Sequence, residues 1–418
     1  MDFETNPKQR VIRRTVREFA TSRIGPIAHE LDQQARFPWE LMDDMKAMNL
    51  FGLQASPEWG GAGMDTISYA ITIEELARVC AGIALAVTVH NSVALYPIEA
   101  YGTEEQKQRV LPGMCSGDRV GAFCVTEPNA GSDASATETT AILDGDRYIV
   151  NGNKIWVTNG AIAGVAVILA RTDPEDKKRG MSTLIVERGM PGFSVGPLED
   201  LCGMRSNPVS SLIMTDCPVP KENLLGRPGD GVRIALQTLD VGRIGIASQA
   251  LGIAQASLDV SLDYAQQRIQ FRAPLTQFQS IQNMLADTAT EIEAARLLVY
   301  QAGWLRDNKR PFSSAAAMAK LYASEASSRA GSRGVQIHGG YGYSKSYPIE
   351  RYWRDARVTE IYEGTSEIQR MVIARSLQET SKPRNRNGSS ASNRSPGNPS
   401  SSGREMPTRS TVTGPKES

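Results

Sequence analysis

The sequence lacks net charge, and it has few cysteines and histidines. Its 418 residues include 46 Lys and Arg and 46 Asp and Glu, so no overall field would attract nucleic acid or an anionic membrane. The five cysteines are odd in number without any C-x-x-C spacing, and the three histidines are scattered. We therefore expect reduced thiols, no metal site and no nucleic-acid partner.

Targeting signals are also missing. The acidic residues Asp2 and Glu4 precede any apolar core, which fits neither a secretory signal nor an Arg-rich transit peptide. We expect no apolar run of membrane-spanning length, and so no membrane insertion. The prediction is a cytoplasmic protein, or one of the mitochondrial matrix if a transit peptide has been removed. The length allows two or three domains with ample core.

Three residue patterns predict a mostly α protein with a central β domain. From Pro7 to Gly117, apolar residues recur at helical spacings of three and four. Between Arg119 and Cys217, short β-prone runs alternate with Gly, Pro, Asn and Asp clusters, which predicts an antiparallel β domain with a hairpin turn at 144–146. Residues 231–271 contain no proline and predict one long helix, and further helices over 277–308, 313–338 and 365–379 imply a bundle.

These patterns place domain boundaries at residues 1–118, 119–228 and 229–380. After Ser381 the composition changes to Ser, Asn, Pro, Gly and Arg, which can bury little apolar surface. Residues 381–418 are therefore predicted to be a disordered tail.

A lone carboxylate, Glu363, lies between the apolar pair Ile361-Tyr362 and Gly364, whose backbone can turn sharply. Ser366 and Gln369 have capping-box spacing, so Glu363 is predicted to lie in a loop just before a helix. Apolar neighbours would raise its pKa, which suits a base near neutral pH. These residues alone leave open an ordinary acid that favours the helix dipole.

Two motifs in the β region offer polar groups beside strands. Residues 123–133 run from a strand into a turn, where Thr126 and Ser132 carry hydroxyls and backbone N–H groups are free for an anionic or carbonyl-rich ligand. Trp156 and Thr158 alternate and would share one face of a strand, so that one covers an aromatic ring and the other hydrogen-bonds it. The alternatives are a plain turn between strands, and a core Trp with a surface Thr.

Two further motifs lie on predicted helices. Asp240 and Arg243 are three residues apart, the spacing of an ordinary ion pair. Residues 336–340, Gln-Ile-His-Gly-Gly, end a helix. No strand precedes these glycines, so a dinucleotide-binding turn is rejected, and the glycines either end the helix or let backbone approach a ligand.

Together these stretches resemble the acyl-CoA dehydrogenase family of flavoenzymes, and within it the short-chain, butyryl-CoA type. Five motifs follow the family's order and spacing over about residues 7–377: Thr-Glu-Pro, Trp-x-Thr, Leu-Asp-x-x-Arg, Gln-x-x-Gly-Gly and Tyr-Glu-Gly-Thr-Ser-Glu-Ile-Gln. The resemblance implies an N-terminal helical domain, an antiparallel β-barrel-like domain and a C-terminal four-helix bundle, assembled as a homotetramer. It also implies FAD, an acyl-CoA substrate, a step of fatty acid β-oxidation and an electron-transfer flavoprotein as partner.

The resemblance assigns binding roles residue by residue. Residues expected around the isoalloxazine are Phe123, Cys124, Val125, Thr126, Ser132, Trp156, Val157, Thr158, Thr365, Ser366 and Glu367. Residues expected to reach the pyrophosphate and adenosine of FAD in a neighbouring subunit are Arg268, Gln279, Gln336, Ile337, His338, Gly339 and Gly340. Residues expected at the acyl-CoA are Ser132, Asp240, Arg243 and Gly364.

The reaction implied is α,β-dehydrogenation of a saturated acyl-CoA to its trans-2-enoyl-CoA. Glu363 would remove the α-proton while the β-hydrogen leaves as hydride to flavin N5. The backbone N–H of the base and a ribityl hydroxyl would stabilise the enolate at the thioester oxygen. Some members place the base on the long helix just before the residue matching Arg243; here that residue is Gly242, so Glu363 has no competitor.

One departure and three alternatives accompany the resemblance. Arg272 stands where the family usually has Gly, and it would either bind phosphate or point to solvent. A branched-chain substrate is possible. A flavin oxidase or monooxygenase on the same fold is disfavoured by the chain's length and by the presence of Glu363. A non-catalytic binding protein is disfavoured because every expected site position is filled.

Overall fold

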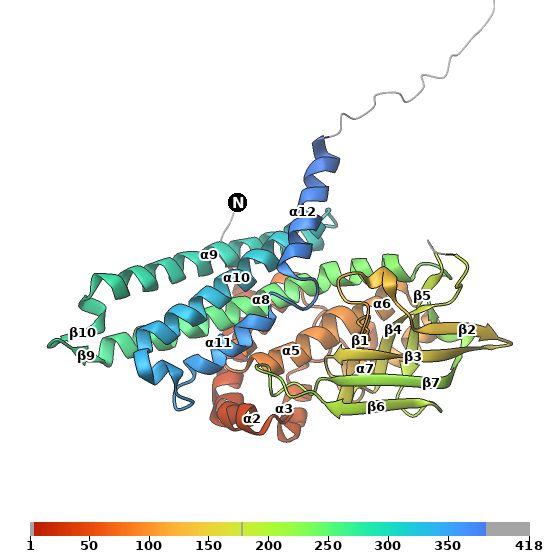
Figure 1. The fold of residues 1–418 in the computed structure, drawn as a ribbon, viewed down its shortest axis with the longest axis horizontal. Coiled ribbons are helices and arrows are strands. Elements are labelled where there is room, and N and C mark those ends of the chain that lie inside the picture. Colours follow the sequence, from red (N-terminus) through yellow and green to blue (C-terminus); the bar gives the residue numbers. More distant parts are fainter. Residues whose placement is uncertain (1–3, 177–178, 382–418) are drawn as a thin grey trace, which may run out of the picture.

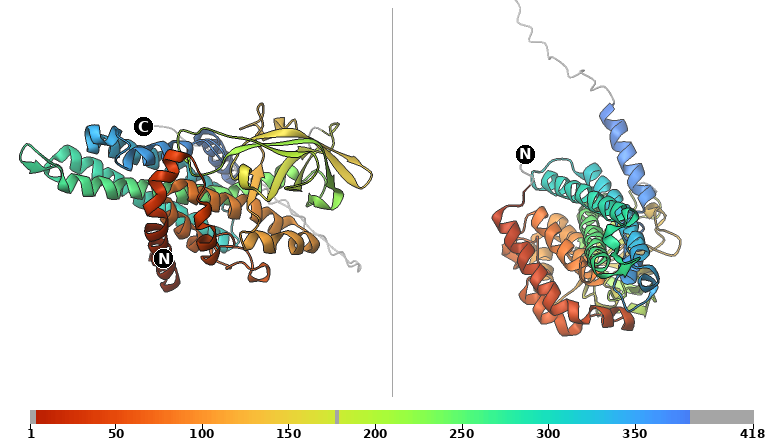
Figure 2. Two further views of the ribbon diagram at one scale, coloured as in Figure 1. Left: turned by 90° about the horizontal axis from the view of Figure 1, so that it is seen from below. Right: turned by 90° about the vertical axis from the view of Figure 1, so that its left-hand side faces the viewer.

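The computed structural model describes residues 4–176 and 179–381, so the predicted tail lies almost wholly outside the described residues. Helices come first along the chain, a sheet follows, and more helices complete it (Figure 1). The sheet occupies one end of the molecule, and the hairpin that follows the long helix α8 occupies the other (Figure 2). The predicted mostly α fold with a central β domain is confirmed.

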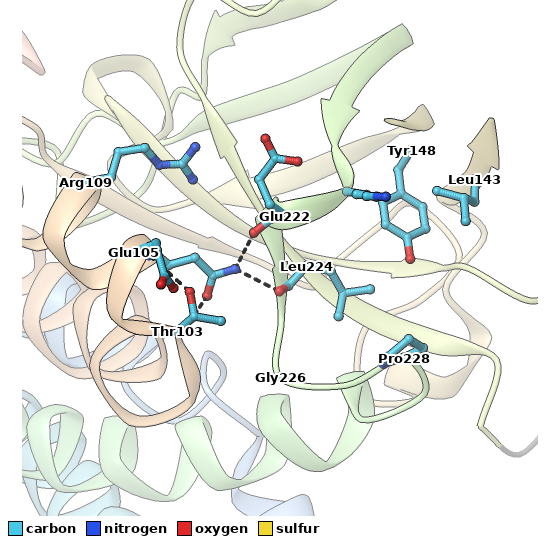
Figure 3. Close-up of a pocket in the computed structure, with 11 residues that line it drawn as sticks. Thr103, Glu105, Arg109, Leu143, Tyr148, Glu222, Leu224, Gly226 and Pro228 are labelled. Carbon is cyan, nitrogen blue, oxygen red and sulfur yellow. Dashed lines mark hydrogen bonds between the residues drawn. The ribbon is translucent and has the colours of Figure 1, made fainter. Parts of the chain in front are cut away.

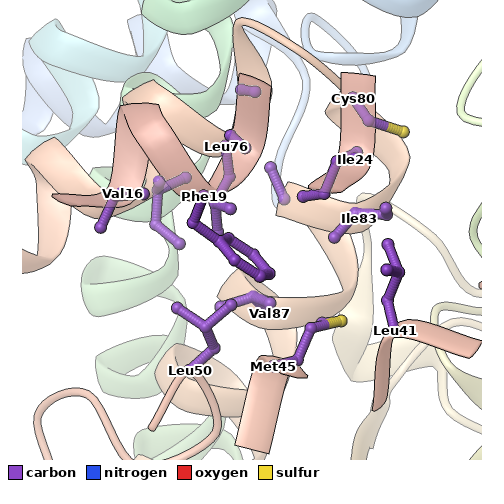
Figure 4. Packing of buried hydrophobic residues seen from close by; sticks show 14 of the residues in the cluster. Val16, Phe19, Ile24, Leu41, Met45, Leu50, Leu76, Cys80, Ile83 and Val87 are labelled. Atoms are coloured by element: carbon purple, nitrogen blue, oxygen red, sulfur yellow. The ribbon is translucent and has the colours of Figure 1, made fainter. Parts of the chain in front are cut away.

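The N-terminal helices pack around apolar side chains at helical spacing. They are α1 Pro7–Phe19, α2 Ala28–Gln34, α3 Met42–Ala47, α4 Thr66–Ala77, α5 Ala81–Val89, α6 Tyr96–Tyr101 and α7 Glu104–Cys115. Asn6 begins α1 with a capping box, since its side chain accepts from the Gln9 N–H and Gln9 returns a bond. Phe19 points into a cluster with Leu76, Ile83 and Val87, which ties α1 to α4 and α5 (Figure 4).

The apolar run from α5 to α6 corrects one prediction. Residues Ala81–Tyr101 form 21 consecutive helical residues that are long and apolar enough to cross a membrane, so the expectation that no run reaches this length is wrong. The fold explains the run, because its most apolar window is 94% buried inside the protein. It is the core helix on which the other helices and the sheet pack. Residues 78–80 separate α4 from α5.

The sheet is mainly antiparallel, with parallel pairing at β1. Its strands are β1 Gly121–Cys124, β2 Thr140–Asp144, β3 Arg147–Val157, β4 Val165–Arg171, β5 Met181–Glu187, β6 Phe193–Leu198, β7 Ser210–Pro220 and β8 Leu224–Leu225. The order is β6-β7-β3-β2-β4-β5-β8, and β1 lies parallel to β4. Asp144 pairs with Arg147 across the predicted hairpin turn, where Gly145 has φ +62°.

The C-terminal helices form the bundle that carries the site. They are α8 Gly231–Gln267, α9 Gln279–Asp307, α10 Ser313–His338, α11 Ile349–Val358 and α12 Ser366–Ser381. Helix α10 contacts α8, α9, α11 and α12, and α8 also packs on α4 and α5. Helix α11 was not predicted, because charged residues dominate it. Trp304 on α9 is 48% exposed.

Helix α8 has 37 residues and ends earlier than the predicted range. A short hairpin of β9 Ile269–Gln270 and β10 Ala273–Pro274 follows it. Phe271 and Arg272 form its two-residue turn with left-handed φ values of +48° and +66°. Two positive φ angles in succession suit a hairpin turn and cannot continue a helix.

Candidate active site

The loop between α11 and α12 presents Glu363 in a left-handed conformation. Glu363 has φ +52° and Gly364 has φ +95°, so the chain turns sharply here. The predicted capping box of Ser366 and Gln369 is wrong. Thr365 caps α12, because its hydroxyl accepts from the Ile368 N–H at 3.3 Å, while the Ser366 hydroxyl is buried without a partner.

Side chains from three helices hold this loop in place. Lys320 Nζ on α10 donates to the Gly364 carbonyl at 2.8 Å. Gln369 Nε2 donates to the same oxygen at 2.8 Å and to the Glu363 carbonyl at 3.3 Å. The Tyr362 hydroxyl donates to Gln249 Oε1 on α8 at 2.6 Å. The loop is thereby fixed to α8, α10 and α12 rather than free at the surface.

The carboxylate of Glu363 has no hydrogen-bond partner. Both oxygens are buried and unpaired within the described part of the chain. Burial raises the pKa of Glu363 to about 7, against the lowering effects of the Lys320 and Arg243 charges. A carboxylate at the helix dipole alone would have a lowered pKa, so the environment fits a base and not the helix-leading acid.

The raised pKa arises from packing rather than from the neighbours in sequence. Ile361, expected to help bury the carboxylate, is 51% exposed. The wall beside Glu363 is α8, where a Cβ on Gly242 would lie 2.1 Å from Glu363 Oε2 and 2.7 Å from Val93 Cγ1. Positions 242 and 363 therefore face the same small space, and only glycine at 242 leaves room for this carboxylate.

Asp240 and Arg243 form the ion pair expected from their spacing. Arg243 Nη1 donates to Asp240 Oδ1 at 2.5 Å, and the Ser313 hydroxyl donates to the same oxygen at 2.8 Å. Arg243 is 3% exposed, and its Nε is buried without a partner. The guanidinium thus brings a positive charge toward Glu363 from α8.

The strand motifs meet beside β3. The Ile155 N–H donates to the Thr126 carbonyl at 3.0 Å, and Lys154 Nζ lies 2.6 Å from Glu127 Oε1. Lys154 is fully buried and Glu127 is 4% exposed. Glu127 also accepts from the backbone N–H groups of Glu138 and Thr139. Burial acts to raise the pKa of Glu127, but these donors hold it below its ordinary value.

Trp156 is exposed because of a bulge in β3, and not because side chains alternate along the strand as the sequence predicts. The register of β3 with β7 shifts between Lys154 and Val157, and Trp156 has φ +55°. This bulge turns the indole outward, where it is 56% exposed. Thr158 follows the strand end. The hydroxyls of Thr126 and Thr158 make no hydrogen bond with any described residue.

The other predicted cofactor residues differ in how far their side chains are exposed to a ligand. The side chains of Cys124 and Val157 are buried in the sheet core, so only their backbone could meet a ligand. Phe123, Val125 and Thr365 are partly buried, while Ser132 and Glu367 are exposed.

The residues predicted for pyrophosphate and adenosine lie elsewhere. Arg268 follows α8 and stacks over the Tyr341 ring at 5.6 Å; Gln279 and Gln336 are exposed nearby in the bundle. Ile337 and His338 are buried, and His338 stacks on Tyr264. A Cβ on Gly339 or Gly340 would meet nothing within 4 Å, so their backbone is open. From Arg243 to Arg268, the chain of α8 runs roughly 38 Å at 1.5 Å per residue.

A separate groove of about 620 Å³ lies between α7 and the sheet (Figure 3). It shares no residue with the predicted site. Gln106, one of its lining residues, donates through Nε2 to the carbonyls of Glu222 at 2.6 Å and Leu224 at 2.9 Å. Among the described residues, no group of three or more His, Cys, Asp and Glu side chains is placed to hold a metal.

Comparison with known proteins matches three family models in order. They are the N-terminal, middle and C-terminal domains of acyl-CoA dehydrogenase, over residues 6–118, 122–217 and 229–378. The chain belongs to the acyl-CoA dehydrogenase family. It is therefore an FAD-dependent oxidoreductase that acts on acyl-CoA.

Relatives within the family share most of the chain. The mouse (Mus musculus) mitochondrial short-chain specific acyl-CoA dehydrogenase is 48% identical over 364 residues, 87% of this chain and 88% of the relative. The butyryl-CoA dehydrogenase structure from Megasphaera elsdenii has a TM-score of 0.89 and 42% identity, and covers 90% of this chain and 100% of that one. A structure described as the electron transferring flavoprotein of Acidaminococcus fermentans has a TM-score of 0.89 and 46% identity, and covers 90% and 99%.

Two functional features were missed by sequence reasoning. Lys320 was not singled out, although a lone lysine within the run 315–320, Ala-Ala-Ala-Met-Ala-Lys, is a signal of a buried charge. Glu127 was quoted only as part of a motif, although its pairing with Lys154 joins the two strand segments.

Proposed function

We propose that this acyl-CoA dehydrogenase oxidises short, straight-chain acyl-CoAs with Glu363 as the α-proton base. The observation that carries the base is the buried, unpartnered carboxylate with a pKa of about 7. Short-chain specificity is supported by the 48% identity to a relative described as short-chain specific. Branched short-chain acyl-CoAs are the alternative substrates.

The residues beside the sheet fit the flat ring system of FAD. An outward-facing indole at Trp156 and the unpaired hydroxyls of Thr126 and Thr158 lie together on adjoining segments, which suits a polar aromatic ligand. When bound, FAD supplies the hydride acceptor. We propose that these residues, with Thr365 and Ser366, hold its ring, and that the buried Ser366 hydroxyl finds its partner there.

Glu363 has two roles in this proposal. Its carboxylate takes the α-proton and, being desolvated, is a stronger base than a solvated glutamate. Its own backbone N–H makes no hydrogen bond with any other described residue, so it is available to the thioester oxygen of the substrate. A donor held at that oxygen stabilises the enolate that forms as the proton leaves.

A tetramer is proposed because, within one subunit, the residues proposed for the flavin ring lie apart from those proposed for the pyrophosphate and adenosine. Arg268 directly precedes β9 and Gln279 begins α9, and the β9–β10 hairpin lies at the end of the molecule opposite β3, the strand that carries Trp156 (Figure 1). A second copy would have to bring them to the pyrophosphate. We further propose an electron-transfer flavoprotein as electron acceptor, and a cytoplasmic location, with the mitochondrial matrix as the alternative.

The substrate class is tested by anaerobic bleaching of the purified yellow protein. Butyryl-CoA should bleach the flavin faster than hexanoyl-, octanoyl- or isobutyryl-CoA. Fastest bleaching by isobutyryl-CoA would indicate the branched-chain enzyme, and no bleaching by any acyl-CoA would contradict the proposal. Rapid reoxidation by air, rather than by an electron-transfer flavoprotein, would indicate a flavin oxidase.

Glu363→Gln tests the base in the same assay. The amide cannot accept the proton, so bleaching by butyryl-CoA should slow by about 10²–10⁴-fold, the usual loss when a general base is removed. FAD content should be unchanged, because Glu363 is not among the proposed cofactor residues. Bleaching at the wild-type rate would contradict the assignment.

A further inference from the structure

A buried lysine lies against the loop that carries the proposed base. Lys320 is 0% exposed on α10, and its Nζ donates a hydrogen bond to the Gly364 carbonyl at 2.8 Å. A buried ammonium is costly unless it has acceptors and a counter-charge. The carbonyl supplies one acceptor, and Glu363 on the same loop supplies the opposite charge.

The contact lies next to the left-handed turn that carries the Glu363 side chain. Glu363 and Gly364 are both left-handed, a conformation that a non-glycine residue adopts only when its surroundings hold it. The carbonyl that Lys320 binds belongs to the residue directly after Glu363. Since Gln369 donates to the same oxygen, the peptide plane between Gly364 and Thr365 is held from α10 and α12 together, and Gln369 also holds the Glu363 carbonyl.

We infer that Lys320 is a positioning residue for Glu363: its ammonium holds the Gly364 carbonyl and so aims the carboxylate, and its charge favours the ionised, proton-accepting form. The inference rests on the proposed role of Glu363 as base. Lys320 does not touch substrate in this account. It acts through the loop and through the electrostatic field at the carboxylate.

The charges around the pair agree with this role. The groups that interact with Glu363 are Lys320 from α10, Arg243 from α8, Tyr69 from α4 and Tyr362 from its own loop. Lys320 in turn interacts with Glu363, Arg243, Glu360 and Glu367. Burial lowers the pKa of Lys320 to about 8, so its charge is present across the range in which Glu363 ionises.

The test is the pH dependence of anaerobic flavin reduction by butyryl-CoA in the FAD-loaded enzyme. Lys320→Met keeps the length of the side chain but removes the charge and the donors. Without the nearby cation, the carboxylate of Glu363 ionises at higher pH. The midpoint of the rate–pH profile should therefore move up by about one pH unit. At a pH below the midpoints of both proteins, the variant should be roughly tenfold slower than the wild type. Above about pH 8 the charge of Lys320 is lost in the wild type too, so the difference in rate between the wild type and the variant should shrink there.

Lys320→Arg and Ser324→Ala are the controls. The arginine retains charge and donors, so its midpoint should stay close to the wild-type value. Ser324 lies one turn along α10, where its hydroxyl bonds the Lys320 carbonyl at 2.7 Å without reaching the loop, so its removal should leave the midpoint unchanged. If Lys320→Met does not load FAD, Lys320→Gln replaces it, and its midpoint must lie above that of Lys320→Arg.

The outcomes separate this inference from the proposed function. If Glu363→Gln is inactive but Lys320→Met, or Lys320→Gln in its place, titrates like the wild type, the role of Lys320 is wrong and the base assignment stands. If Glu363→Gln reduces flavin at the wild-type rate, both fail together. The inference is supported if the midpoint of the rate–pH profile is higher in the neutral variants than in the wild type and returns to the wild-type value in Lys320→Arg.

Discussion

Two buried glutamates in this protein each lie near a buried lysine, yet their pKa values shift in opposite directions. At the sheet, Lys154 donates directly to Glu127, two backbone N–H groups add to it, and the pKa of Glu127 is lowered. At the bundle, Lys320 donates to the carbonyl beside Glu363, the carboxylate has no donor, and its pKa rises to about 7. The presence of a buried lysine therefore does not by itself set the protonation state of a neighbouring glutamate. That state depends on which atom accepts the lysine's hydrogen bond.

The difference also separates structural from chemical roles. Glu127 has no free oxygen for a proton or a ligand, and it joins the Thr126 turn to β3. Glu363 keeps both oxygens free at a cost in stability. Neutral variants of the two glutamates should therefore change the stability of the protein in opposite directions.

Lys154→Met should give the largest stability loss. It leaves Glu127 buried without its counter-ion, which costs about 3–5 kcal/mol when one partner of a buried pair is removed. The Thr126 turn should loosen, so FAD content should fall as well. Thermal unfolding and the flavin absorbance of the purified protein measure both effects.

The double variant Glu127→Gln/Lys154→Met is the control for that prediction. It removes both charges, so most of the lost stability should return. An equal or larger loss in the double variant would show that packing, and not the unpaired charge, causes the effect.

Glu363→Gln should stabilise the protein at pH 8, whereas Glu127→Gln should destabilise it. The folded pKa of Glu363 lies above its ordinary value of 4.5, so its ionisation costs stability progressively from about pH 4.5 to 7 and fully above pH 7. A shift to about 7 corresponds to about 3 kcal/mol. Glu127 has a lowered pKa, so its contribution is present above its unfolded pKa and is lost as the pH falls through the folded pKa.

Unfolding midpoints at pH 5 and pH 8 distinguish these signs. The gain from Glu363→Gln should be present at pH 8 and mostly absent at pH 5. A loss of stability for both variants at pH 8 would remove the contrast between the two carboxylates.

Arg272→Gly should have the smallest effect and separates backbone strain from charge. Arg272 and Glu363 are both left-handed non-glycine residues, so relief of strain at the exposed Arg272 turn shows what that conformation alone costs. The gain in stability should be at most about 1 kcal/mol, because the greater entropy of glycine in the unfolded chain offsets part of the relieved strain. If FAD content falls while the melting temperature rises, Arg272 binds phosphate; if it does not, the side chain points to solvent.

The sequence was sufficient for the fold and for proposing Glu363 as the base, but not for the surroundings of that residue. Periodicity placed α10 at its observed ends, and the spacing of Asp240 and Arg243 predicted their ion pair. The contacts of Glu363 come from α8 and α10, far away in sequence, and its neighbour Ile361 turned out to be exposed. The bulge at Trp156 could not be predicted, because strand register depends on the partner β7.

The most direct test of the central claim is the pH dependence of wild-type flavin reduction by butyryl-CoA, measured anaerobically by stopped flow. The rate should rise with pH through a midpoint near 7, where Glu363 loses its proton, and this ionisation should be absent from Glu363→Gln. A flat profile, or a midpoint near the ordinary glutamate value of 4.5, would contradict a buried, unpartnered base at Glu363.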